Sequence, residues 1–109
     1  MLILPIKKKW FDMIKSEEKK EEYREIKRYW DVRFLKAIGF SEPEFKDVKE
    51  LLEQKECSKP MIIEFRNGYS TDSPYIVANC YLSIKEGKEK WGAEPGAKYY
   101  VLRIDRIII

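Results

Sequence analysis

The alternation of hydrophobic and polar residues divides the first third of the chain into four predicted elements. Residues 2–6 are almost all apolar and predict a short strand. In residues 7–16 the apolar side chains recur at helical spacing opposite charged ones, which predicts an amphipathic helix. Residues 20–26 alternate with a period of two, as a strand does. Residues 27–37 have no clear period, and we expect a turn or short helix there whose aromatic side chains pack back.

The remaining two thirds of the chain predict one more helix and three longer strands. Ser41 with a glutamate three residues later is the pattern of a capping box, so a helix should begin there and continue to about residue 55. Strands are predicted at residues 61–65, 75–84 and 99–109, and the Asn-Gly pair after the first marks a tight turn. The side chains expected to face the core are Phe45, Val48, Leu51, Leu52, Ile76, Ala78, Cys80, Leu82, Ile84, Tyr100, Leu102 and Ile104, and those expected to face outward are Tyr75, Asn79, Tyr81, Ser83, Arg103 and Asp105.

This order of elements, with strands and helices alternating before a run of strands, predicts an α+β domain whose later strands curl into a partly open β-barrel. We expect about five to six strands and two to three flanking helices. At 109 residues the chain is long enough for one hydrophobic core and too short for two, so residues 1–109 should form a single domain. The sequence has no internal repeat, linker or low-complexity tract.

The composition is that of a soluble globular protein, since 44% of the residues are hydrophobic and 38% are charged. No apolar run approaches the roughly 20 residues of a membrane span, and the apolar start is too short for a secretory signal. We therefore expect no membrane contact and a cytoplasmic location. The net charge is only +3, but residues 1–36 hold eleven Lys and Arg against seven Asp and Glu. Positive potential should therefore belong mainly to this first third.

The chain contains no histidine, which narrows the chemistry available to it. Serine or cysteine nucleophiles paired with histidine are excluded, as are imidazole acid–base pairs and nearly all catalytic zinc sites. Cys57 and Cys80 are not spaced as a metal-binding pair and should be reduced thiols, with Cys80 buried in the core. We predict no metal and no cofactor, and any reaction would depend on Lys, Glu, Asp, Tyr or Ser.

Residues 14–35 mix charges of both signs with aromatic side chains, and this segment is the strongest functional signal in the sequence. Because cations meet phosphates and rings stack on bases, this mixture is typical of surfaces that bind planar anionic ligands. Lys19 should lie where the first helix meets the next strand, and Glu22 and Arg24 should share one face of that strand. If that face is the barrel interior, the buried charges must pair or meet a ligand. If it faces outward, they are ordinary surface charges.

Residues 16–24, Ser-Glu-Glu-Lys-Lys-Glu-Glu-Tyr-Arg, resemble the signature of the ASCH family, a branch of the PUA-like superfold. That signature runs Gly-x-Lys-x-x-Glu-x-Arg. Lys19, Glu22 and Arg24 match it, while Glu17 stands in place of the glycine. The departure implies either a turn without a positive φ or an altered backbone contact at Glu17. The early strand and helix, and the final strand after a Trp-Gly loop, are also similar to this family, so the resemblance spans the chain.

The resemblance implies a PUA-like barrel whose cleft is lined by Lys19, Glu22 and Arg24 and binds RNA or a modified nucleoside. Some ASCH members are ribonucleases, and others are amidohydrolases that act on acylated cytidine. Our main expectation is binding of RNA or a nucleotide-like ligand in this cleft. The alternative is a hydrolase of either kind that works without histidine or metal. In that case Lys19 or Arg24 would hold a phosphate or oxyanion and Glu22 would exchange a proton, with Glu64 and Glu94 as candidates for a further acid.

Other residues are predicted at the edge of this cleft. Tyr29, Arg33 and Trp91 are expected ligand contacts, although each could instead pack against the barrel. The hairpin tip at residues 67–69 could border the cleft. A third alternative is a protein-interaction module that uses the aromatic residues of 23–34 as a hot spot. The sequence has no motif for sequence-specific DNA recognition, and it leaves the oligomeric state open.

Overall fold

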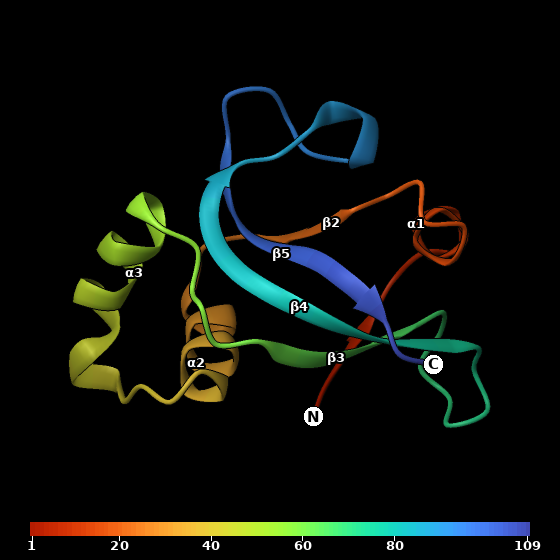
Figure 1. Ribbon diagram of the computed structural model, residues 1–109, viewed down its shortest axis with the longest axis horizontal. Coiled ribbons are helices and arrows are strands. Elements are labelled where there is room, and N and C mark those ends of the chain that lie inside the picture. The colour runs from red at the N-terminus through yellow and green to blue at the C-terminus, as the bar shows by residue number, and fades with distance from the viewer.

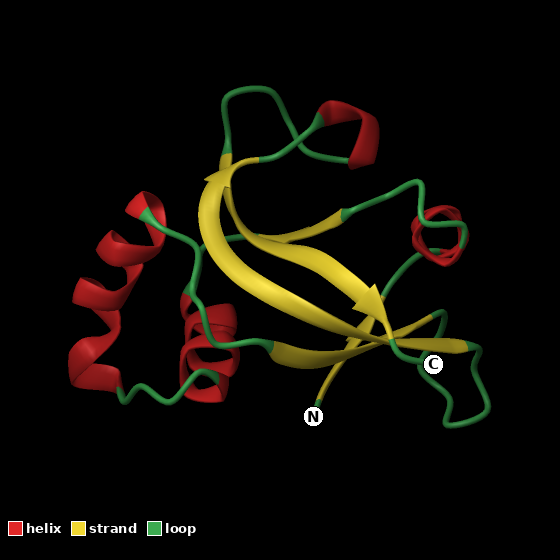
Figure 2. Cartoon of the chain, viewed as in Figure 1, coloured by secondary structure: helices red, strands yellow, loops and turns green.

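The computed structural model describes all of residues 1–109 and contains five strands and three helices (Figures 1 and 2). The strands are β1 (Leu2–Pro5), β2 (Glu21–Arg24), β3 (Met61–Arg66), β4 (Tyr75–Glu86) and β5 (Lys98–Ile107). The helices are α1 (Lys8–Lys15), α2 (Arg28–Ala37) and α3 (Phe45–Gln54), with short 3-10 turns η1 (Glu42–Glu44) and η2 (Glu89–Trp91). Helices α2 and α3 lie together on one side of the curled sheet, and α1 lies at the opposite end (Figure 1).

The strand order is β1-β3-β4-β5-β2, so β1 and β2 are the two edges of the sheet. β1 pairs with β3 in parallel, and the other neighbouring pairs are antiparallel. β4 and β5 are long and curved, and their register shifts at Asn79/Cys80, where a bulge adds to the bend. The expected α+β fold is confirmed as a five-stranded mixed half-barrel with three helices, left open between β1 and β2. None of the three helices has the length and apolar character needed to cross a membrane.

Alternation along the strands decides which side chains form the core. Every second residue of β4 from Ile76 to Ile84 is buried, as predicted, and the β5 residues in register with them include Leu102 and Tyr100, which have no exposed surface. Each such side chain contributes about 1.5–3 kcal/mol when it leaves water. Burial also raises the pKa of the Cys80 thiol to about 12, in agreement with a structural rather than a reactive cysteine.

Three local features add to or differ from the sequence-based expectations. The segment without a clear period is the regular helix α2. Leu51, expected in the core, is 62% exposed, because α3 buries Phe45, Val48 and Leu52 and turns Leu51 away. Ser83 lies on the outer face as predicted, yet it is buried, because the loop after β4 covers that face of the sheet.

The turn after α1 places Glu17 in a left-handed backbone conformation, with a φ of 66°. The Glu17 amide donates to the Ile14 carbonyl at 2.9 Å, and the Lys19 amide donates to the Met13 carbonyl at 2.9 Å. The chain therefore leaves the helix as it does at a glycine cap. Of the two interpretations of the missing motif glycine, the turn without a positive φ is wrong.

Glu17→Gly is expected to raise the free energy of unfolding by about 1 kcal/mol, because glycine adopts a left-handed φ without the steric cost of a Cβ. Chemical denaturation of the two proteins measures the difference. Glu18→Gly is the matched control at the next exposed position, where φ is not positive, and it should lower stability. A Glu17→Gly protein less stable than the wild type would contradict the prediction.

Candidate functional site

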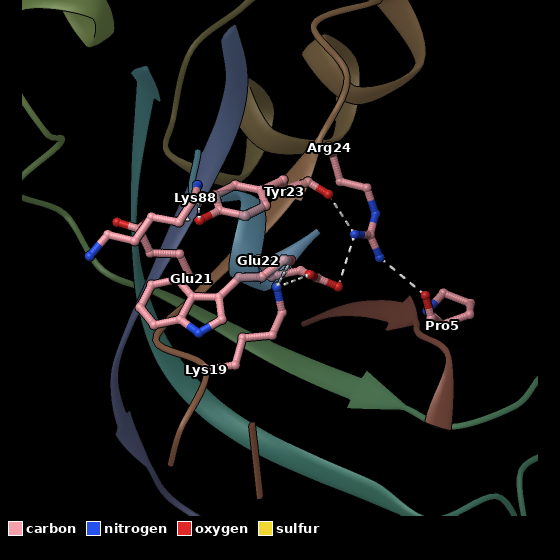
Figure 3. A network of polar contacts seen from close by, with 8 residues as sticks. Pro5, Lys19, Glu21, Glu22, Tyr23, Arg24 and Lys88 are labelled. Carbon is pink, nitrogen blue, oxygen red and sulfur yellow. Dashed lines mark hydrogen bonds and ion pairs between the residues drawn. The ribbon is translucent and has the colours of Figure 1, made fainter. Parts of the chain in front are cut away.

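Lys19, Glu22 and Arg24 form one continuous chain of ion pairs, called here the buried chain (Figure 3). Lys19 Nζ lies 3.1 Å from Glu22 Oε1, and Arg24 Nη1 lies 3.1 Å from Glu22 Oε2. Glu22 is in register with Leu102 of β5 and Arg24 with Tyr100, and both partners are core residues. The two charged side chains therefore enter the barrel. Of the two orientations that the sequence left open, the inward one is observed.

Lys19 is the most deeply buried member, and its side chain has no exposed surface. Its Nζ donates to the Trp91 carbonyl at 2.6 Å and lies 4.9 Å from the ring centroids of Trp10 and Tyr23. Removal from water lowers the pKa of Lys19, and the adjacent Glu22 carboxylate opposes that shift. The Lys19 ammonium is thus surrounded by a carboxylate, a backbone carbonyl and two aromatic rings.

Arg24 joins the two edge strands of the half-barrel. Its Nη2 donates to the Pro5 carbonyl of β1 at 3.1 Å, and its Nη1 donates to the Tyr23 carbonyl at 2.7 Å (Figure 3). The guanidinium carbon lies 5.4 Å from the centroid of the Trp30 ring, and the side chain is 17% exposed. A guanidinium group has five N–H groups, and these two bonds together with the Glu22 pair use about three of them. The remaining N–H groups make no hydrogen bond within the protein.

The start of α2 adds rings and a second guanidinium group beside Arg24. Trp30 stacks on Phe34 with the ring centroids 5.2 Å apart and meets the edge of Tyr29 at 4.8 Å. The Arg33 guanidinium lies 3.4 Å from the Tyr29 ring centroid and donates to the Tyr29 carbonyl at 3.0 Å. Phe34 is buried, whereas Tyr29 is 51% exposed. We call the connected set Arg24, Trp30, Tyr29 and Arg33 the stacking strip.

Trp91, predicted as a ligand contact, does not join this strip. Its ring is buried among Tyr23, Ala93 and Val101 on the outer face of the sheet, and its carbonyl oxygen is the atom that reaches Lys19. Stacking of this ring on a ligand would require the loop between β4 and β5 to move. The contact between Trp91 and Lys19 could not be predicted from residue types, because a backbone carbonyl makes it.

A second polar group occupies the outer face of β2. The Tyr23 hydroxyl donates to Glu21 Oε1 at 2.8 Å and accepts from the Lys88 amide at 3.0 Å (Figure 3). Lys85 Nζ lies 3.1 Å from the other oxygen of Glu21. Burial, with Glu21 adding to the effect, raises the pKa of Tyr23. This group attaches β2 to the loop that covers Lys19.

The two acids considered for hydrolysis lie apart from the buried chain. Glu64 is on the outer face of β3 and pairs with Arg66, whose Nε donates to it at 2.8 Å. Glu94 is exposed in the loop after η2. The hollow that Lys19 helps to line measures about 10 Å³, and a space of that size holds no more than one water molecule. A substrate therefore does not reach Lys19 in this conformation.

Two larger hollows open near the stacking strip. One of about 370 Å³ lies between residues 5–7 and the hairpin tip 67–69, so it begins at Pro5, whose carbonyl accepts from Arg24. The hairpin tip thus borders a hollow next to the buried chain. A second of about 770 Å³ lies between α2 and the first residues of β1 and β3, and Arg33 helps to line it.

Asp31 is a buried polar residue that the sequence analysis did not identify. The Tyr100 hydroxyl donates to Asp31 Oδ1 at 2.5 Å, and Lys49 Nζ donates to Asp31 Oδ2 at 3.0 Å. Burial, together with the Asp31 carboxylate, raises the pKa of Tyr100. The group fixes α2 to β5 and α3. Helical spacing was the available signal, because Asp31 lies one turn before the core residue Phe34.

No group of three or more His, Cys, Asp or Glu side chains is arranged to hold a metal ion. Comparison of the chain with protein-family models, curated proteins and solved structures gives no match in any of the three. Inference about function therefore depends on the geometry and chemistry described above.

Proposed function

We propose that this protein is a cytoplasmic, ASCH-type domain of the PUA-like superfold that binds RNA or a nucleotide-like ligand. The observation that carries the proposal is the convergence of Lys19, Glu22 and Arg24 in one buried chain. That chain ends at the partly exposed Arg24, next to a surface of rings and guanidinium groups.

The backbone at Glu17 supports the resemblance to the family. The motif glycine falls at this position, and the φ of 66° is one that glycine adopts most readily. The turn after α1 is thus kept although the glycine is not. That turn determines where Lys19 enters the barrel, since the Lys19 amide closes the end of α1.

Burial divides the roles within the proposed site. Lys19 and Glu22 are positioning residues, because their charged groups contact each other, Trp91 and Arg24 rather than solvent. Ligand contacts belong to the stacking strip, where Arg24 and Arg33 can meet phosphates. Tyr29 offers a ring, and the outer face of a guanidinium group also accepts a base.

Tyr29→Ala is expected to weaken the binding of single-stranded RNA about tenfold, since stacking of one base on an aromatic side chain contributes about 1–3 kcal/mol. Fluorescence anisotropy with a labelled oligoadenylate measures the affinity. Wild-type affinity should also fall steeply between about 50 and 200 mM salt, because bound phosphates release counterions. Tyr75→Ala is the matched control, as Tyr75 is 50% exposed against 51% for Tyr29, and it should leave the affinity unchanged.

A wild-type protein without salt-sensitive affinity for RNA or nucleotides would overturn the proposal. Equal losses of RNA affinity in the Tyr29 and Tyr75 variants would show that the stacking strip does not contact the ligand. Arg24→Ala is a less decisive variant than Tyr29→Ala. Its side chain bonds to both edge strands, so the substitution is expected to reduce stability as well as binding.

A hydrolase at the same residues is the second candidate function. The direction of the Lys19 pKa shift favours it, because a lower pKa makes it easier to remove the proton and so to form the amine that can act as a base or nucleophile. In the described conformation the Trp91 carbonyl and two rings cover that amine, so a substrate would need the covering loop to open. Rates on RNA and on acylated cytidine, compared among wild type, Lys19→Ala and Glu22→Gln, test this function. Equal rates in the three would exclude it.

A protein-interaction module through residues 23–34 has less support. Tyr23 and Phe34 are buried, and Trp30 is half-buried against Phe34. Tyr29 is therefore the one aromatic of the segment with half its surface exposed. A protein partner held there would bind without the salt dependence that phosphate contacts produce.

A further inference from the structure

We propose that the hollow between α2 and the starts of β1 and β3, called here the α2 groove, is the second half of the ligand site. We also infer that the ligand is single-stranded RNA rather than a duplex. This inference rests on the RNA-binding function proposed above. It deepens that function by naming the form of the nucleic acid and a second region that contacts it.

The α2 groove combines apolar walls with two cations in a volume of about 770 Å³. The apolar surface includes Met1, Leu2, Met61 and Ile62, and the cations are Arg33 and Lys36. No carboxylate lines the groove. Lys36 is exposed and Ile62 is 43% exposed, so both kinds of surface are accessible. A matching occupant carries a flat apolar group next to negative charge, as a base and its phosphate do.

Arg33 makes the α2 groove continuous with the stacking strip. Its guanidinium lies against the Tyr29 ring, and Arg33 is also one of the residues that line the groove. Tyr29 contacts Trp30, which contacts Arg24 at the end of the buried chain. Cationic and aromatic side chains therefore follow one another from the seam between β1 and β2 along α2. This arrangement suits a linear chain of nucleotides better than one isolated nucleotide.

The apolar walls and rings indicate a single strand. In a duplex the base faces are stacked inside the helix, so a protein meets mainly the sugar-phosphate backbone. The cations of the groove would serve such a ligand, but Ile62 and Tyr29 would have nothing to contact. Unpaired bases expose flat faces that stack on rings and guanidinium planes, whatever their sequence. The mixture of exposed apolar surface and cations thus favours unpaired nucleotides.

The salt dependence of binding tests the phosphate contact in the groove. Lys36→Gln is expected to reduce the slope of log affinity against log salt by about 0.7, the share of one single-strand phosphate contact. Lys46→Gln is the matched control, an exposed lysine on α3 that does not line the groove, and it should leave the slope unchanged. The probe is the labelled oligoadenylate, and thermal melting verifies that each variant folds.

Two further measurements test whether the RNA occupies the groove and whether it binds as a single strand. Ile62→Glu places a carboxylate in the groove and should weaken oligoadenylate binding about tenfold by repelling the phosphates. Leu51→Glu, at an exposed apolar position on α3, should have no such effect. A duplex RNA of the same length should bind about tenfold more weakly than the single strand at equal salt, because its bases cannot stack on the protein.

Failure of this inference is distinguishable from failure of the proposed function. If Lys36→Gln matches Lys46→Gln in slope, or if the duplex binds as tightly as the single strand, the groove proposal is overturned. A Tyr29→Ala effect would then still support RNA binding at the stacking strip. If the wild type has no affinity for either RNA, both proposals fall together.

Discussion

Glu22→Gln is expected to lower the free energy of unfolding by about 3–5 kcal/mol, the cost typical of removing one partner from a buried ion pair. The Glu22 carboxylate lies between two cations, and its two oxygens face Lys19 and Arg24 separately. Glutamine has the same shape but no charge, so the cations would face one another without the group that neutralises them. Lys19 has no exposed surface through which water could compensate.

Two variants make this prediction specific to the carboxylate. Lys19→Met should cost less, about 1–3 kcal/mol, because Glu22 keeps Arg24 as its partner and the main loss is the charged donor to the Trp91 carbonyl. Glu25→Gln removes a carboxylate that is 74% exposed and should change stability by no more than about 0.5 kcal/mol. Urea unfolding at neutral pH measures all three. A Glu22→Gln protein as stable as Lys19→Met would show that the carboxylate does not hold the cations together.

The cost of Glu22→Gln should also shrink as the pH rises. Burial holds the pKa of Lys19 in the folded protein below its ordinary value of 10.5, and loss of Glu22 lowers it further. Between the folded and unfolded pKa values the unfolded chain binds the proton that the folded chain lacks, so stability rises with pH. The pKa of Lys19 differs more between the folded and unfolded states in the variant, so the variant should gain more stability as the pH rises toward 10.5. If the stability difference between the wild type and Glu22→Gln stayed constant with pH, Lys19 would not be the group responsible for the pH dependence.

Most of the fold could be predicted because alternation is a local property. Each face of β4 has a single environment along its length, so the period of two in residues 76–84 identified the core side correctly. Helix α2 was harder, since Asp31 and Arg33 interrupt its apolar residues and conceal the helical period. The strand order was not accessible at all. It depends on pairing between β2 and β5, which are far apart in the sequence.

The candidate site could be predicted in part for the same reason. Spacing placed Glu22 and Arg24 on one face, but the strand Glu-Glu-Tyr-Arg has no apolar side that would tell which face is buried. Pairing of Glu22 with Leu102 decides this, and pairing is a tertiary feature. The Trp91 carbonyl that accepts the hydrogen bond from Lys19 belongs to the backbone, so the residue type at position 91 does not predict this contact.

The buried chain explains how the two edge strands of the half-barrel are linked although they do not pair. β1 and β2 share no backbone ladder, and Arg24 bridges them through the Pro5 carbonyl. Hydrophobic residues often replace buried ion pairs without loss of stability, so a link between these two strands does not by itself require three charges. A ligand that needs a guanidinium group held at this seam gives a reason to keep them. The structural role of Arg24 and its proposed role in binding would therefore be two consequences of one arrangement.

Asp31→Ala is expected to lower the free energy of unfolding by about 3 kcal/mol, because it leaves a buried hydroxyl without an acceptor and a lysine without its partner. Tyr100 has no exposed surface, and its hydroxyl donates to Asp31. Asp31→Asn keeps an oxygen that can accept this bond and loses only the charge facing Lys49, so it should cost about 1 kcal/mol. Tyr100→Phe removes the donor and should cost a similar amount.

Asp47→Ala is the matched control, since Asp47 stands in the first turn of α3 as Asp31 does in the first turn of α2, but it is exposed. The Asp47→Ala variant loses a favourable interaction between a carboxylate and a helix start, worth about 0.5 kcal/mol, as Asp31→Ala does. It loses no buried contact. The double variant Asp31→Ala with Tyr100→Phe should be more stable than the sum of the single changes predicts, because the second change removes the unpaired hydroxyl. Additive losses, or an Asp31→Ala cost equal to that of Asp47→Ala, would mean that the hydroxyl finds another partner and that this bond does not hold α2 against the sheet.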